Sequence, residues 1–145
     1  MKAMFDMALT AQDTKIRDLV ALVQKYREGI ANNSVIATLE TGLVIKNMTG
    51  IELNLLPCGI DGGYLQLARL VSSGNLRLVI FLHDPLLRLD DSGVMEFLRS
   101  CNVHNVPFAN NMTTAEFILH RFLEKEMATC WRCPEARPER NLICA

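Results

Sequence analysis

Side chains that can take up a proton recur in this sequence shortly after hydrophobic runs. Asp13 follows "MALTAQ", Glu40 follows "VIATL", and Asp84 follows "VIFLH". Asp61 lies in "CGIDGGY", beside a double glycine of the kind that lets a backbone approach a ligand closely. Because a carboxylate can remove a proton from a substrate, these segments predict a catalytic or binding pocket, provided that the fold brings them together.

The overall composition is that of an ordinary globular protein. The chain has 145 residues, 50% of them hydrophobic and 21% charged, which suits one domain with a substantial core. The formal net charge of -1 gives no sign of a nucleic-acid or membrane partner. No apolar run is long enough to span a bilayer, and the N-terminus lacks a secretory pattern. We therefore expect a cytoplasmic protein.

Short apolar runs alternate along the chain with amphipathic segments. The expected strands are residues 4–11, 34–40, 51–57, 76–82 and 106–110, and the expected helices are 13–32, 42–50, 64–73, 92–105 and 113–128. Such alternation predicts a single-domain, three-layer α/β/α fold in which helices cover both faces of a central, mainly parallel sheet. Ligands bind at the carboxyl ends of the strands in such sheets, which is where the carboxylates described above lie.

Two helix starts carry capping signals. Ser92 is expected to be an N-cap, and Thr113 with Glu116 forms a capping-box pattern. We assign residues 1–126 to the α/β domain and residues 127–145, which contain cysteine, proline and arginine, to a C-terminal tail.

The five cysteines give an odd count, and three of them lie in the tail. Without a secretory signal, this number favours reduced thiols over a disulfide framework. The motif "CWRC" places Cys130 and Cys133 at the spacing of a zinc or redox pair, and Cys144 and His120 are the nearest additional ligands. Because Pro134 follows the motif at once, we favour incidental thiols and expect no metal site, with a zinc or thiol element in the tail as the alternative.

Several quoted segments resemble the methylglyoxal synthase family. The stretch "GIDGGYLQLARLVSSGNLRLVIFLHDPL" is similar to that family's succession of glycines, helix, I/V-S-x-G, hydrophobic strand and Asp-Pro-Leu. The segments "NVPFANNMTTAEFIL", "MALTAQDTK" and "ATLETG" resemble its "NIPVATNxATADFxI", "IALIAHDxxK" and "ATGTTG". The resemblance extends from about Met4 to Leu119 without a large insertion, so it covers most of the chain.

The resemblance implies a reaction and a set of binding residues. The family converts dihydroxyacetone phosphate into methylglyoxal and phosphate, which needs a carboxylate base, donors for the developing oxyanion and a phosphate cradle. It implies no cofactor, and it implies a homo-oligomer, namely a hexamer. The positions that match its phosphate-binding and close-approach segments are Thr38, Thr41, Gly59, Gly62 and Gly63.

Six other positions of the implied pocket depart from the family pattern. The base position, directly after the double glycine, holds Tyr64, and a tyrosine with an unperturbed pKa of about 10 is a poor base at neutral pH. Glu40 replaces a threonine of the cradle, where a negative charge about 4 Å from a phosphate would cost roughly 4 kcal/mol; solvent exposure or pairing with Lys15 or Arg17 is the alternative. The remaining substitutions are Gln12 for histidine, Ile16 for lysine, Asp91 for histidine and Val94 for aspartate.

The carboxylates that remain leave two functional interpretations. Asp61 could serve as a relocated base, although a turn aspartate that bonds its own backbone is the more ordinary role, and Asp13 and Asp84 are the other catalytic candidates. We predict a catalytically degenerate methylglyoxal synthase-like protein that serves as a small-molecule-binding or interaction module, with a metabolite as the kind of ligand. The alternative is an active synthase, or a related lyase, that uses a base such as Asp61.

Overall fold

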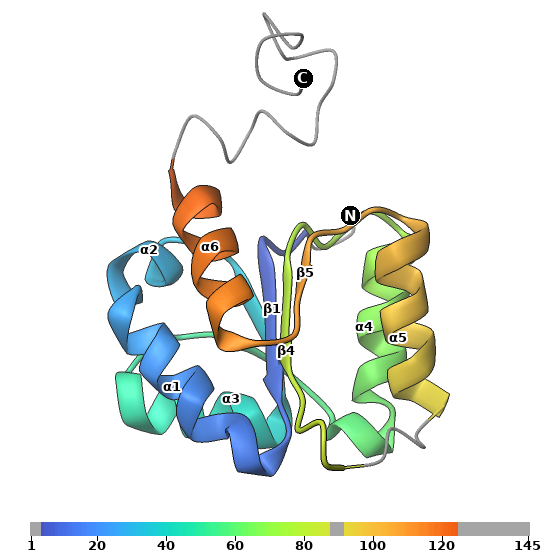
Figure 1. Ribbon diagram of the computed structural model, residues 1–145, viewed down its shortest axis with the longest axis horizontal. Helices are drawn as coiled ribbons and strands as arrows, with labels where there is room; N and C mark the ends of the chain where they lie inside the picture. The colour runs from blue at the N-terminus through green and yellow to red at the C-terminus, as the bar shows by residue number, and fades with distance from the viewer. Residues whose placement is uncertain (1–3, 88–91, 125–145) are drawn as a thin grey trace, which may run out of the picture.

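The computed structural model describes residues 4–87 and 92–124, which form a five-stranded parallel sheet with helices on both faces (Figure 1). The strands are β1 (Met7–Ala11), β2 (Val35–Thr38), β3 (Asn54–Leu56), β4 (Val79–Leu82) and β5 (Phe108–Ala109). They are arranged in the order β3-β2-β1-β4-β5, and every pair is parallel. Every residue of β1, β2 and β4 is buried, as expected for the apolar central strands of a parallel sheet.

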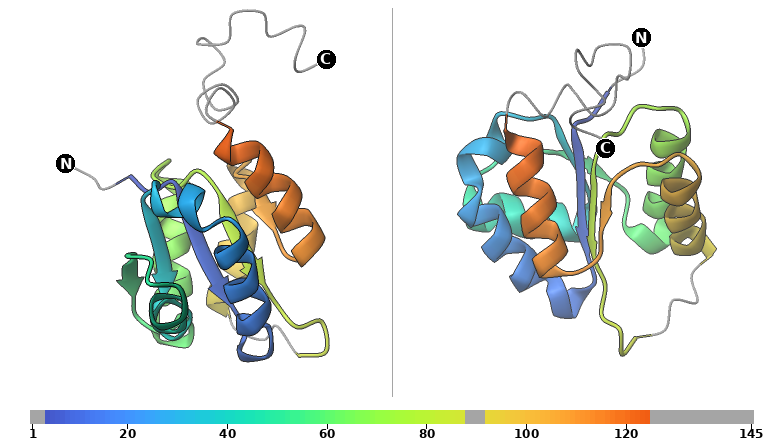
Figure 2. Two further views of the ribbon diagram at one scale, coloured as in Figure 1. Left: turned by 90° about the vertical axis from the view of Figure 1, so that its left-hand side faces the viewer. Right: turned by 45° about the horizontal axis from the view of Figure 1, so that its top comes forward.

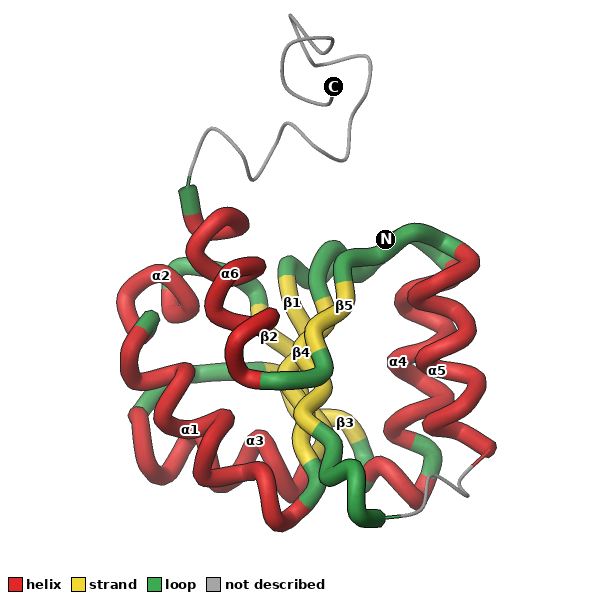
Figure 3. The backbone as a smooth tube through the Cα atoms, in the orientation of Figure 1, coloured by secondary structure: helices red, strands yellow, loops and turns green. Residues whose placement is uncertain are grey.

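The helices form the two outer layers, as the views in Figures 1, 2 and 3 agree. One layer contains α1 (Ile16–Lys25), α2 (Arg27–Ala31), α3 (Leu39–Thr49) and α6 (Met112–Leu123). The other contains α4 (Gly63–Ser72) and α5 (Ser92–Val103). Two short 3-10 turns, η1 (Asp13–Lys15) and η2 (Gly59–Asp61), lead from β1 and β3 into α1 and α4. The predicted three-layer α/β architecture with a parallel sheet is therefore confirmed.

Alternation along the strands divides the core into two clusters. In β1, Met7 and Leu9 pack toward α1, α3 and α6, whereas Ala8 belongs to the cluster under α4 and α5. In β4, Leu82 joins the first cluster and Phe81 the second. Successive side chains of a strand point to opposite faces, so each strand contributes to both layers and ends at the same edge of the sheet.

Some element boundaries differ from those expected. The strands are shorter, the first helix is interrupted at Tyr26, and α3 begins directly after β2 rather than at residue 42. Ser92 is the first residue of α5. Because residue 91 lies outside the described ranges, the N-cap role of Ser92 stays a prediction.

The capping box predicted for the last helix is wrong. The N-cap of α6 is Asn111, which has an extended backbone and whose Oδ1 accepts a hydrogen bond from the Thr114 N–H at 3.0 Å. Thr113 lies inside the first turn, and Glu116 instead accepts a hydrogen bond from Lys25 Nζ at 2.8 Å. The helix starts earlier because an asparagine that follows a strand is an equally good cap.

The ends of the chain carry predictions that the structure does not describe. Residues 125–145, including Cys130, Cys133 and Cys144, lie outside the described residues. The assignment of residues 127–145 to a separate tail therefore remains a prediction. In the part of the chain that the structure describes, no helix has both the length and the apolar character needed to cross a membrane.

Candidate ligand-binding site

The carboxyl ends of the strands meet at one edge of the sheet, at the bottom of Figure 1. Glu40 lies in the first turn of α3, directly after β2, and Gly59 opens the turn that follows β3. Asp13 begins η1 after β1, and Asp84 follows β4. The parallel topology therefore brings the predicted site segments to one edge, as we expected from their positions after strands.

The two threonines of the predicted phosphate cradle are fully buried and bonded within the protein. Thr38 and Thr41 have no exposed surface. The Thr38 hydroxyl lies 3.0 Å from that of Thr10 and 3.4 Å from that of Thr41. The Thr41 hydroxyl also lies 3.3 Å from both the N–H and the carbonyl oxygen of Ala11. These hydroxyls connect β1, β2 and α3, so their hydrogen bonds support the fold.

Glu40 reaches across to the glycine turn. Its Oε1 accepts a hydrogen bond from the Gly59 N–H at 3.2 Å, and its Oε2 is buried without a hydrogen-bond partner among the described residues. Of the alternatives raised for Glu40, pairing with Lys15 or Arg17 is not found among the ion pairs of the described residues, where Lys15 lies 4.0 Å from Asp18 instead. The side chain is half-buried rather than fully exposed to solvent. The carboxylate occupies a backbone donor that the family resemblance assigns to phosphate.

Cys58 lies beside this carboxylate, and its pKa is raised. The main cause is Glu40, which as a hydrogen-bond acceptor favours the protonated thiol, and desolvation adds to the effect. Replacing Glu40 with glutamine is therefore expected to lower the Cys58 pKa and to increase its alkylation by iodoacetamide near pH 8 several-fold. Peptide mass spectrometry measures the rate at Cys58 separately from the other cysteines. Glu52→Gln, on an exposed side chain, is the control, and an unchanged Cys58 rate in Glu40→Gln would contradict the assignment.

Neighbouring backbone atoms and one aromatic ring leave no room for a side chain at two glycines of the turn. A Cβ atom at Gly59 would lie 2.3 Å from the Tyr64 ring, and one at Gly63 would lie 2.4 Å from the carbonyl oxygen of Pro57. Gly62 has a φ of 105°, a conformation that favours glycine. The turn needs its glycines because the ring and the chain pass so close to it.

Tyr64 points into the core beneath the turn. It is only 6% exposed, and its ring centroid lies 5.4 Å from that of Phe81 and 6.3 Å from that of Phe97. Phe81 also contacts the ring of His83, whose Nδ1 is buried without a hydrogen-bond partner among the described residues. We call Tyr64, Phe81 and Phe97 the aromatic cluster. The residue at the family's base position is thus part of the hydrophobic core.

Asp84 is held by three neighbours after β4. Its Oδ1 accepts a hydrogen bond from the Leu86 N–H at 2.9 Å, and its Oδ2 accepts one from the Thr14 hydroxyl at 2.8 Å. The side-chain oxygen of Gln12 accepts a hydrogen bond from the Asp84 N–H. The Leu86 and Thr14 donors hold the pKa of Asp84 below its usual value, so it stays ionised. Both carboxylate oxygens are engaged in bonds that fix the β4 turn.

The other predicted site residues are more dispersed. Asp13 and Asp61 are exposed to solvent. Ile16 packs against the core cluster under α1, and Val94 is 4% exposed in the cluster under α5. Asp91 lies outside the described residues. At the two apolar substitutions, therefore, the side chains contribute to packing in the described structure.

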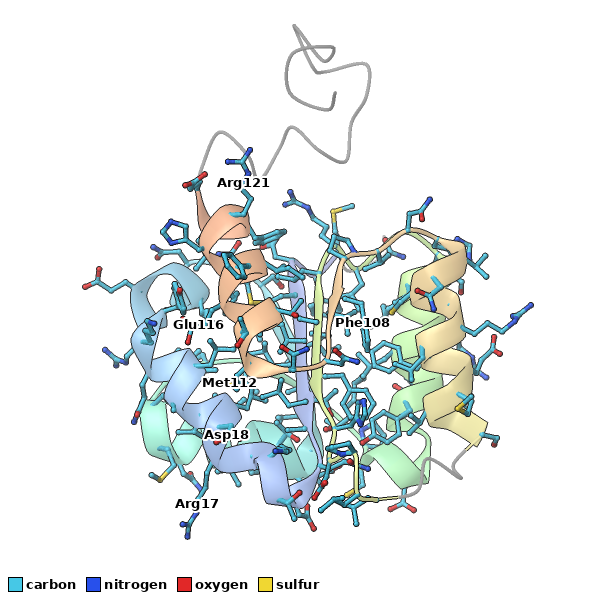
Figure 4. The ribbon with its side chains drawn as sticks, in the orientation of Figure 1. Arg17, Asp18, Phe108, Met112, Glu116 and Arg121 are labelled. Carbon is cyan, nitrogen blue, oxygen red and sulfur yellow. The ribbon has the colours of Figure 1, made fainter. Side chains whose placement is uncertain are left out.

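A separate cavity of about 410 Å³ lies between α1 and the start of α6. It is lined by Lys15, Asp18, Leu82, His83, Pro85, Asn110, Asn111 and Met112. Figure 4 labels Asp18 on α1 and Met112 on α6, both in the helical layer at the left of the view. None of the cradle threonines or turn glycines lines this cavity, so it lies beside the predicted site.

Comparison with known proteins relates this chain to named enzymes. It is 39% identical over 117 residues to methylglyoxal synthase from Carboxydothermus hydrogenoformans, across 80% of this chain and 97% of that protein. It is 42% identical over 113 residues to methylglyoxal synthase from Moorella thermoacetica, across 77% and 88%. The chain belongs to the methylglyoxal synthase family. No family model matches the sequence.

A solved methylglyoxal synthase shares the fold of this family member. The crystal structure of the enzyme from Elizabethkingia anophelis superposes with a TM-score of 0.77 at 37% identity, over 83% of this chain and 81% of that one. The resemblance recognised from the sequence segments is therefore confirmed at the level of family and fold.

Sequence reasoning missed several contacts in this methylglyoxal synthase relative. Thr14 binds Asp84, Thr10 binds Thr38, and Cys58 lies beside Glu40. Thr10 and Thr14 flank the predicted "QD" pair, so their position next to a strand end was the one available signal. Gln12 was noted as a substitution, but its bond to the Asp84 backbone depends on how β1 pairs with β4.

Proposed function

We propose that this chain is a methylglyoxal synthase-like protein that has lost the family's chemistry and serves as a small-molecule-binding or interaction module. The observation that carries the proposal is the position of Tyr64, whose ring lies in the aromatic cluster with 6% exposure. The reaction begins with removal of a proton from carbon, and a misplacement of about 1 Å can reduce such a step about a hundredfold. A phenol packed between phenylalanines does not supply this base.

The surrounding substitutions support the same proposal. Glu40 bonds the Gly59 N–H, and both Ile16 and Val94 pack into the core where the family has charged side chains. Each change removes a donor, acceptor or charge on which the reaction depends, and none of them disturbs the sheet. Loss of selection for catalysis, with retention of the fold and its pocket edge, accounts for this combination.

An active synthase that works through Asp61 is the second candidate. Its support is that Asp61 is exposed and lies two residues before Gly63 in the turn. Asp84 is a weaker base candidate, because the Leu86 and Thr14 donors engage both of its oxygens and lower its pKa. Asp13 is exposed, and among the described residues its side chain makes no hydrogen bond to the turn, so it is not a stronger candidate.

Assembly and compartment follow as further parts of the proposal. Family membership supports a homo-oligomer, which we propose to be a hexamer, in the cytoplasm. The ligand is proposed to be a small metabolite that is uncharged or cationic, because Asp13, Glu40, Asp61 and Asp84 all lie at this edge.

The direct test is release of methylglyoxal from dihydroxyacetone phosphate. Under identical conditions, kcat/KM of this protein is expected to be at least about a thousandfold below that of the Elizabethkingia anophelis methylglyoxal synthase, since loss of acid–base groups typically costs about 10²–10⁴-fold. Turnover within about a hundredfold of that enzyme, abolished by Asp61→Asn, would establish the second candidate instead. Asp18→Asn, the same substitution at an exposed position of α1, is the control for Asp61→Asn and should leave turnover unchanged.

A further inference from the structure

The start of α3 and the turn after β3 together have the construction of an anion site. The helix spans 11 residues, and its N-cap Thr38 makes no side-chain capping hydrogen bond. The Gly59 N–H points across from the neighbouring loop toward the first turn of the helix, where Glu40 lies. Backbone N–H groups at a helix start and in a glycine turn attract negative charge, and phosphate groups bind at such places.

In this chain a carboxylate already lies there. Glu40 is the second residue of α3, where the positive end of the helix dipole favours a negative side chain, and its Oε1 takes the Gly59 N–H at 3.2 Å. The Thr38 and Thr41 hydroxyls have no exposed surface and bond to Thr10 and Ala11, so they do not face an incoming ligand. Of the donors that could hold a phosphate, the Gly59 N–H and the two hydroxyls are therefore already engaged.

The second carboxylate oxygen of Glu40 also lies inside the protein. Its Oε2 is buried with no hydrogen-bond partner among the described residues, although a buried carboxylate oxygen normally has one. The neighbouring Cys58 thiol, whose pKa this carboxylate raises, lies within the same turn. The carboxylate therefore lies within the cradle, between the Gly59 N–H and the Cys58 thiol, as an internal substitute for a bound anion would.

We infer that Glu40 determines the ligand specificity of the strand edge: its carboxylate is an internal ligand of the cradle formed by α3 and the glycine turn, and it excludes phosphate and phosphate esters. The inference deepens the proposed function and rests on it. A phosphate would have to displace Oε1 from the Gly59 N–H and approach a like charge. A ligand of this site is consequently a molecule without a phosphate group.

Inorganic phosphate and the variant Glu40→Thr test the inference. In ¹⁵N-labelled protein, about 10 mM phosphate is expected to leave the Gly59 amide of the wild type unshifted and to shift the Gly59 amide of Glu40→Thr. The dissociation constant of phosphate from Glu40→Thr should be at least about tenfold lower than that from the wild type. Glu52→Thr, which removes an exposed carboxylate elsewhere, should behave as the wild type. Chloride at equal ionic strength separates specific binding from screening.

Three outcomes would overturn the inference. The first is wild-type protein that binds phosphate with the same constant as Glu40→Thr. The second is a folded Glu40→Thr variant in which phosphate leaves the Gly59 amide unshifted. If that variant does not fold, Glu40→Gln replaces it: this variant should bind phosphate more tightly than the wild type, and an unchanged affinity is the third.

Failure of this inference is distinguishable from failure of the proposed function. The phosphate titration uses no dihydroxyacetone phosphate and reports only on the Gly59 amide. Methylglyoxal release by the wild type would remove the degenerate-site proposal, whereas phosphate binding by the wild type without turnover would remove only the role of Glu40.

Discussion

Replacing Tyr64 with aspartate is expected to lower the free energy of unfolding by about 3–5 kcal/mol and to leave methylglyoxal formation at the wild-type level. The substitution removes a ring that lies 5.4 Å from Phe81 and 6.3 Å from Phe97 and leaves a cavity in the cluster under α4 and α5. It also places a carboxyl group where the side chain is 6% exposed, which adds a desolvation cost. Urea denaturation measures the loss.

The matched control retains the ring. Tyr64→Phe should keep most of the stability, because the contacts with Phe81 and Phe97 remain. The result that would contradict this account is a Tyr64→Asp variant as stable as the wild type that converts dihydroxyacetone phosphate. Such a variant would mean that a carboxylate at residue 64 restores the base. It would also mean that packing in the aromatic cluster does not prevent residue 64 from reaching the substrate.

Replacing Gly63 with alanine is expected to lower the free energy of unfolding by about 1–3 kcal/mol. The new Cβ would lie 2.4 Å from the Pro57 carbonyl oxygen and 3.0 Å from that of Cys58, and both are backbone atoms. The chain must therefore move, and the hydrogen bond from the Gly63 N–H to Cys58 at 3.0 Å would be strained. Thermal and urea unfolding measure the change.

Gly29→Ala is the control for the Gly63 substitution. A Cβ at Gly29 would lie 2.7 Å from a methyl group of Leu123, the end of a side chain that can rotate. Alanine also has a higher helix propensity than glycine by about 1 kcal/mol, so Gly29→Ala in α2 should be neutral or stabilising. Equal losses for the two variants would show that close backbone contact at Gly63 does not constrain the turn.

Much of the fold could be predicted from the sequence because its signals are local. The run "LRLVIFL" indicates a buried strand, and the amphipathic spacing after Asp13 indicates a helix, so the alternation alone predicts a parallel sheet. Boundaries were less predictable. Asn111 and Thr113 are both plausible caps, and the choice between them depends on where β5 ends, which is set by its pairing with β4.

The site could be predicted only in part, because its contacts cross between strands. The sequence indicates that Tyr64 and Glu40 depart from the family pattern, and it places their segments at one sheet edge. It does not indicate that Glu40 bonds the Gly59 N–H, a contact that depends on the register of β2 against β3. It likewise does not reveal that Tyr64 turns inward, which depends on the rings that α5 and β4 supply.

We propose that the pocket lacks the base that begins the reaction, and nuclear magnetic resonance of dihydroxyacetone phosphate in D₂O detects such a base through hydrogen exchange. A protein with a working base would exchange a carbon-bound hydrogen of the substrate for deuterium, release methylglyoxal, or do both. We predict neither exchange nor methylglyoxal above the rate in buffer alone, while the Elizabethkingia anophelis methylglyoxal synthase consumes the substrate in the same experiment. Protein-dependent exchange or methylglyoxal formation that disappears in Asp61→Asn would contradict the account.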